Sequence, residues 1–237
     1  MSREQIRKTQ FHIAGKRIEV YPSPESDSAV VYVNTFAEEG DKVYQALCGM
    51  DCSDFTLVAV SSLKWNHDMA PWDIPSVFEK DTPCTGGADN YLQLLTEEIM
   101  PRAEKLVHGV SWRGLAGYSL AGLFAVYSLY RTAVFSRIAS MSGSLWFPGL
   151  MEYIASHEMK RLPECVYFSI GDRESRTKNP YLQTVQENTE KIQSLYAGYG
   201  IDTFFQLNRG NHYKNAVQRT ATGISWILNR TGPRNTY

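Results

Sequence analysis

The sequence predicts an α/β fold, in which a mostly parallel central sheet carries helices on both faces. Short β-like runs alternate with longer helical patterns along the 237 residues, and this alternation is typical of parallel sheets. Several of the runs are apolar throughout, as strands buried on both faces are. A hydrophobic content of 43% is enough for one sizeable core. We therefore expect residues 1–237 to form a single domain.

The N-terminal part is expected to form an antiparallel hairpin followed by two buried strands. Residues 11–21 contain two short β-like runs that flank Gly15, a residue typical of turns. Residues 29–33 and 56–60 are rich in β-branched residues and lack charges, which predicts two buried strands. A helix over residues 41–48 is expected to connect them.

A long segment without periodicity follows, at residues 61–90. It contains Trp65, Trp72, several prolines and two consecutive glycines. Unstructured segments of this length are uncommon inside domains and often contribute to function, so we expect a loop that faces a substrate. A helix over residues 90–107, kinked at Pro101, is expected to come next.

The C-terminal half continues the alternation of strands and helices. The helix expected to follow the first of its strands is apolar around most of its circumference, which indicates burial on most sides. We expect strands at residues 112–117, 137–141, 165–170 and 203–207, and helices at residues 120–130, 148–157, 180–199 and 213–229.

Composition narrows the classes of partner. Lys and Arg total 24 and Asp and Glu total 25, so the net charge of −1 gives no field that would recruit nucleic acid or an anionic membrane. The polar residues 1–5 are not followed by the apolar region of a signal peptide, and the longest apolar stretch, residues 120–129, is too short to cross a bilayer. We expect a cytoplasmic protein with a small-molecule substrate. The oligomeric state is not predicted.

The four cysteines are scattered. None forms a Cys-x-x-Cys pair, so we expect buried, reduced thiols, with a metal site or a disulfide as the alternatives.

The segment Gly117-Tyr118-Ser119-Leu120-Ala121 carries the strongest chemical signal. A Gly-x-Ser-x-Gly pattern between a strand and a helix is the nucleophile elbow of α/β-hydrolases, and this segment lies between a predicted strand and a strongly apolar helix. Ala121 departs from the usual glycine, but a methyl group often fits there. The alternative is a glycine-rich turn with an unremarkable serine. The context favours an α/β-hydrolase fold with Ser119 as the nucleophile.

The partners of such a serine follow it in the order acid, then histidine. An acid is expected just beyond the strand at residues 165–170, where Asp172 and Glu174 both stand. We prefer Glu174 because the acid commonly lies a few residues past the strand end, and we keep Asp172 as the alternative. His212 follows the last predicted strand, as the catalytic histidine should. The other four histidines do not meet this requirement.

An oxyanion hole needs two backbone N–H groups. The first is expected from Leu120, the residue after the nucleophile, at the N-terminus of a helix whose dipole favours negative charge. The second is expected from the loop after residues 29–33, at Asn34, Thr35 or Phe36. Of these we choose Thr35.

These segments together resemble the putative-esterase family, which includes esterase D and the enterochelin esterases. The resemblance rests on residues 117–122, on the acid loop at residues 171–180, on residues 210–213, and on the hairpin at residues 11–24. It implies an α/β-hydrolase fold and hydrolysis of carboxylic esters, siderophore trilactones among them, with Ser119 as nucleophile and His212 as base. Since some enterochelin esterases are thought to use a serine–histidine dyad, the resemblance leaves the acid open.

The expected activity is therefore ester hydrolysis through an acyl-enzyme on Ser119, without a cofactor or metal. Trp65, with Trp72 and Phe147, is expected to give the site an aromatic wall suited to aryl or siderophore-type esters, and Arg173, with Arg176, is expected to attract an anionic substrate. Two alternatives remain. One is an acyltransferase or thioesterase with the same triad, and the other is a non-catalytic binding protein on a hydrolase scaffold.

Overall fold

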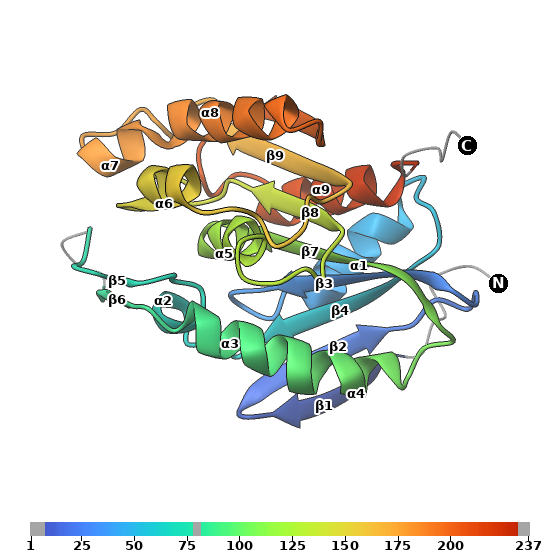
Figure 1. Cartoon of the computed structure of the whole chain (residues 1–237). Coiled ribbons are helices and arrows are strands. Elements are labelled where there is room, and N and C mark those ends of the chain that lie inside the picture. Colours follow the sequence, from blue (N-terminus) through green and yellow to red (C-terminus); the bar gives the residue numbers. More distant parts are fainter. Residues whose placement is uncertain (1–7, 78–81, 232–237) are drawn as a thin grey trace.

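A computed structural model describes residues 8–77 and 82–231 of the chain. Its main feature is an eight-stranded sheet with the strand order β1-β2-β4-β3-β7-β8-β9-β10 (Figure 1). The predicted hairpin is present, and its second strand also runs antiparallel to β4, whereas all other neighbours are parallel. The strands are β1 (Thr9–Ile13), β2 (Lys16–Tyr21), β3 (Ser28–Asn34), β4 (Phe55–Ser61), β7 (Val110–Tyr118), β8 (Arg137–Met141), β9 (Cys165–Gly171) and β10 (Asp202–Asn208).

Helices cover both faces of this sheet, which confirms the predicted α/β class (Figure 1). One face is covered by α1 (Gly40–Cys48) and α9 (Ala216–Leu228), which also contact each other. The other face carries α3 (Ala88–Leu94), α4 (Met100–Glu104), α5 (Leu120–Ser128), α6 (Leu150–Ser156) and α8 (Val185–Gly198).

The apolar runs of the sequence are explained by the two layers of core. Along β3, Val30 and Tyr32 join the cluster beneath α3 and α5, whereas Val31 and Val33 join the cluster beneath α1 and α9. Since successive side chains of a strand point to opposite faces, a strand buried on both sides must be apolar at every position.

Several helix boundaries differ from the predictions. The helix expected at residues 90–107 starts two residues earlier and ends at Glu104, and a π-helical turn at Leu95–Ile99 directly precedes the helix that contains Pro101. The helix expected at residues 180–199 is two helices, α7 (Pro180–Gln183) and α8, which are separated at Thr184. The last helix starts three residues later than predicted, because Asn215 has a left-handed backbone with φ of 56°.

The segment at residues 61–90 is more ordered than the predicted loop. It contains the short helix α2 (Trp65–Asp68), and two antiparallel strands of two residues each, β5 (Asp73–Ile74) and β6 (Cys84–Thr85), before α3 begins at Ala88. Short elements of this kind have too few residues for periodicity to reveal them. Residues 78–81 of this segment lie outside the described residues, as do residues 1–5, on which the expectation about a signal peptide rests.

Three further expectations concern membrane-spanning helices, the cysteines and the number of domains. In the described part of the chain, no helix is long and apolar enough to cross a membrane. Of the four cysteine thiols, that of Cys48 is half-buried and those of Cys52, Cys84 and Cys165 are buried. That residues 1–237 form a single domain stays a prediction.

Candidate active site

Ser119, Glu174 and His212 follow three different strands of the parallel part of the sheet. Ser119 comes directly after β7, Glu174 comes three residues after β9, and His212 comes four residues after β10. The carboxyl ends of parallel strands meet at one edge of a sheet, so these residues, far apart in the sequence, gather at the same edge.

The backbone at Ser119 makes a sharp turn between β7 and α5. Its φ of 59° and ψ of −125° are unusual for a residue other than glycine. A Cβ atom at Gly117 would collide with the backbone carbonyl group of Ala121, so only glycine fits there. The Ala121 methyl group is itself fully buried, which shows that this elbow accepts alanine at its last position.

The side chains of the three residues form a continuous hydrogen-bonded series. Ser119 Oγ lies 3.1 Å from His212 Nε2, and His212 Nδ1 lies 2.7 Å from Glu174 Oε2. This order places an imidazole between a hydroxyl group and a carboxylate, and such an arrangement can activate the hydroxyl oxygen as a nucleophile.

The second carboxylate oxygen of Glu174 is fully occupied. Glu174 Oε1 accepts hydrogen bonds from the Gly171 N–H at 2.6 Å, from the Ser142 hydroxyl at 2.7 Å and from Arg219 Nη1 at 3.2 Å. Burial by itself raises the pKa of Glu174, but the hydrogen bond and charge of His212, together with the bonds from Ser142 and Gly171, hold its pKa below the ordinary value. Glu174 is therefore a carboxylate at neutral pH.

Asp172, the alternative acid, lies elsewhere in the same loop. Its Oδ1 accepts the Gly210 N–H at 2.8 Å, and its own N–H donates to the Asn208 carbonyl oxygen at 2.7 Å. The Gly210 hydrogen bond is the main reason that the pKa of Asp172 is lowered. Asp172 thus ties the end of β9 to the loop that carries His212, but it does not contact the imidazole.

Two residues that sequence reasoning missed support this arrangement. The Tyr118 hydroxyl donates to the His212 carbonyl oxygen at 2.6 Å and accepts from Arg219 Nη1 at 3.2 Å. Arg219 has only 4% of its surface exposed and contacts Glu174 and Ser142 through the same nitrogen. One buried guanidinium group therefore links the acid to the backbone of the histidine.

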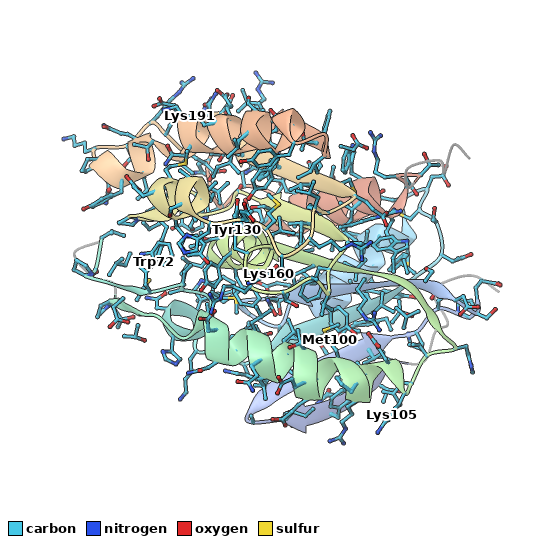
Figure 2. The ribbon with its side chains drawn as sticks, in the orientation of Figure 1. Trp72, Met100, Lys105, Tyr130, Lys160 and Lys191 are labelled. Atoms are coloured by element: carbon cyan, nitrogen blue, oxygen red, sulfur yellow. The ribbon has the colours of Figure 1, made fainter. Side chains whose placement is uncertain are left out.

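Replacing Arg219 by Met is expected to lower the free energy of unfolding by about 3 to 5 kcal/mol, because it leaves the buried Glu174 charge without its cation. Chemical denaturation followed by circular dichroism measures this difference. The matched control is Lys191→Met on α8 (Figure 2), which removes an exposed cation paired with Glu187 and should cost less than about 1 kcal/mol. Equal, small losses in both variants would contradict the role of the Arg219 contact.

The expected oxyanion donors need one correction. Leu120 lies at the first position of α5, where a backbone N–H has no partner within the helix. The Thr35 N–H, however, donates to the Val60 carbonyl oxygen at 2.8 Å, since the ladder between β3 and β4 extends one residue past β3. Among the described residues, no hydrogen bond engages the N–H of the next residue, Phe36, which makes it the available donor of this loop.

A cavity of about 500 Å³ opens at Ser119. Its wall includes Ser119, Leu120 and His212. Trp65 and Phe36 contribute an aromatic surface, with their rings edge-on and the ring centroids 5.2 Å apart. Its other walls are largely apolar and include Ile74, Pro75, Val77, Trp146, Leu182, Val185 and Val217. This volume suits a small to medium organic substrate.

Four residues expected to bind substrate lie outside the cavity, namely Trp72, Phe147, Arg173 and Arg176. Arg173 is exposed and does not line it, so the expected attraction of an anion by this side chain has no structural basis. Trp72 packs against Phe147, Tyr127 and Tyr153 and donates from Nε1 to the Pro148 carbonyl oxygen, beside α6 in Figure 2. Phe147 is a core residue and the half-buried Trp72 packs against the core, whereas Trp146, which was not expected there, lines the cavity.

Comparisons with known proteins agree with the fold. The family described as "Putative esterase" matches residues 41–220, which confirms the resemblance seen in the sequence. The chain is 25% identical to YbbA of Bacillus subtilis, described as an uncharacterized protein, over 92% of this chain and 95% of that protein. Among solved structures, siderophore hydrolase EstA from Aspergillus nidulans has a TM-score of 0.71 and 18% identity, with 94% of each chain covered. An IroE-like serine hydrolase from Shewanella oneidensis has a TM-score of 0.75 and 17% identity, covering 94% of this chain and 80% of that one.

Proposed function

The chain belongs to the "Putative esterase" family and is a carboxylic ester hydrolase, and from this we propose that it cleaves its substrates through an acyl-enzyme on Ser119. The observation that carries the proposal is the hydrogen-bonded series from Ser119 through His212 to Glu174. The strained backbone at Ser119 supports it independently, because such strain is found at nucleophile elbows.

In the proposed mechanism, His212 Nε2 takes the proton of the Ser119 hydroxyl group as Oγ attacks the ester carbonyl carbon. The N–H groups of Leu120 and Phe36 stabilise the negative charge on the carbonyl oxygen. The imidazolium then gives its proton to the leaving alcohol. A water molecule, activated by the same nitrogen, releases the acid and restores Ser119.

Glu174 acts in this mechanism by holding the histidine. A carboxylate that accepts from Nδ1 fixes the tautomer in which Nε2 is free to take a proton, and it stabilises the imidazolium that forms. Its lowered pKa keeps it in the required charge state. Ser142, Arg219 and the Gly171 N–H keep the carboxylate in place.

The proposed substrates are esters with an aryl or siderophore-type body. The rings of Phe36, Trp65 and Trp146 along the cavity favour a flat or bulky apolar group beside the reacting ester. Siderophore hydrolysis is what the name of the Aspergillus nidulans neighbour states, and it comes to this chain as a proposal.

A panel of esters tests this function. We expect hydrolysis of short-chain aryl esters and of siderophore-type lactones by the wild-type protein, and a kcat at least about 10⁴-fold lower for the Ser119→Ala variant, as measured by product release. The proposal would be contradicted if the wild-type protein hydrolysed thioesters faster than every oxygen ester in the panel. It would also be contradicted if the protein transferred acyl groups to alcohols faster than it hydrolysed any of these esters. More than a few per cent of the wild-type activity in a folded Ser119→Ala protein would contradict the assigned nucleophile.

A further inference from the structure

Few of the described residues that line the cavity have acidic or basic side chains, and the acidic ones outnumber the basic ones. Among the described residues that line it, the acidic and basic side chains are those of Glu39, Glu174 and His212, and none is a lysine or an arginine. In a cavity with apolar walls, each such charge acts on a ligand more strongly than it would in water. The sign of the charge that remains uncompensated therefore decides which ligands enter readily.

Glu174 is not that uncompensated charge. Its two oxygens are engaged by His212 on one side and by Arg219, Ser142 and Gly171 on the other. Arg219 is itself buried behind the acid and does not line the cavity. The nearest buried cation thus balances Glu174 and is unavailable to a substrate.

Glu39 is the uncompensated charge. This half-buried residue directly precedes α1, three residues beyond Phe36, and its Oε2 accepts the Ala37 N–H at 2.9 Å. No described basic side chain lies within 4.0 Å of its carboxylate. Its neighbour Glu38, by contrast, pairs with Arg17 at 2.5 Å and does not line the cavity.

Exposed aromatic rings accompany this carboxylate in the cavity wall. Phe36 is 68% exposed and Tyr213 is 85% exposed, and both line the cavity. The faces of aromatic rings attract cations, quaternary ammonium groups among them. Arginines of this region gather instead around the half-buried Asp172, where Arg173 and Arg209 help to lower its pKa, and neither of them lines the cavity.

We propose that Glu39 selects substrates by charge, so that the natural substrate is an uncharged or cationic ester and anionic esters are disfavoured. This inference rests on the proposed ester hydrolysis at Ser119 and narrows its substrate class. It replaces the expectation that Arg173 would draw an anionic substrate into the site.

Matched esters of three charges test this selection. Each series has a trimethylammonium, a tert-butyl or a carboxylate group at the same position, on the acyl chain in one series and on the alcohol in the other. In at least one series we expect the wild-type kcat/KM to be about tenfold or more higher for the cationic than for the anionic ester. Glu39→Gln should bring this ratio to within about threefold of one, whereas Glu38→Gln, which removes the same charge outside the cavity, should leave it unchanged.

The ratio is taken within one protein, so it does not depend on the active fraction of a variant. The test does not require Glu39→Gln to fold, because a second measurement uses the wild-type protein alone. Its ratio should fall as the ionic strength rises from about 0.02 to 0.5 M, because salt screens the carboxylate. A ratio near one in both series, a ratio unaffected by both Glu39→Gln and salt, or an equal effect of Glu38→Gln would overturn the selection by Glu39. Failure to hydrolyse even the uncharged esters would instead overturn the proposed function.

Discussion

Replacing Ser119 by Ala is expected to lower kcat for aryl esters by about 10⁴- to 10⁶-fold, because the oxygen that would form the acyl-enzyme is gone and only binding and the oxyanion donors remain. KM should change little, since the cavity walls stay in place. Steady-state hydrolysis of a short-chain aryl ester measures both constants, and a thermal unfolding curve verifies that the variant folds.

The matched control for this variant is Ser156→Ala. Ser156 closes α6, is exposed and does not line the cavity, so its replacement should leave kcat within about twofold of wild type. A Ser119→Ala protein that folds normally and keeps more than a few per cent of the wild-type kcat would rule out covalent catalysis at this residue.

Glu174→Gln is the second large effect, with kcat expected to fall by about 10³- to 10⁴-fold at neutral pH. The amide has nearly the shape of the carboxylate, but it carries no charge to stabilise the imidazolium and can present an N–H group to His212 Nδ1. That arrangement favours the tautomer in which Nε2 holds a proton and cannot accept one from Ser119. Hydrolysis rates of the purified variant, compared at equal concentrations of folded protein, measure the loss.

Asp172→Asn is the matched control in the same loop. Asparagine keeps an oxygen that can accept the Gly210 N–H, so the position of the loop that carries His212 is preserved, and kcat should stay within about threefold of wild type. A small effect in both variants would indicate a serine–histidine dyad. A large effect of Asp172→Asn alone would show that the acid has been assigned to the wrong residue.

Local sequence patterns predicted the strands correctly where the strands are buried on both faces. Residues 29–33 and 57–60 are apolar on both faces because helices lie above and below them, and continuous apolar runs report this directly. The start of α9 at Ala216 depends on the left-handed backbone of one residue, Asn215, and the break between α7 and α8 depends on Thr184 alone, whose backbone stays right-handed. Periodicity does not record such conformations, so both boundaries were misplaced.

Some residues of the candidate site could likewise be predicted from local patterns, and others could not. Ser119, Glu174 and His212 could be proposed together because each follows a strand whose carboxyl end faces the same edge. Ser142 follows β8 at that edge as well and could have been found by extending this rule.

Arg219 and Thr35 could not have been assigned correctly from the sequence. Arg219 reaches Glu174 from within α9 because of the way this helix packs against β7, β8 and β9. Thr35 is engaged because the hydrogen-bond ladder runs one residue past the end of β3, to Val60. Both facts depend on how separate elements meet, which spacing along the chain does not specify.

The covalent step at Ser119 is tested most directly by mapping the adduct of a fluorophosphonate. The reagent is incubated with the wild-type protein, the mass of the intact protein is measured, and the modified peptide is sequenced by fragmentation. We expect one adduct per chain, located on Ser119, with little labelling of Ser119→Ala and slower labelling of Glu174→Gln. An unlabelled wild-type protein, or an adduct that forms equally well in Ser119→Ala, would contradict the proposed nucleophile.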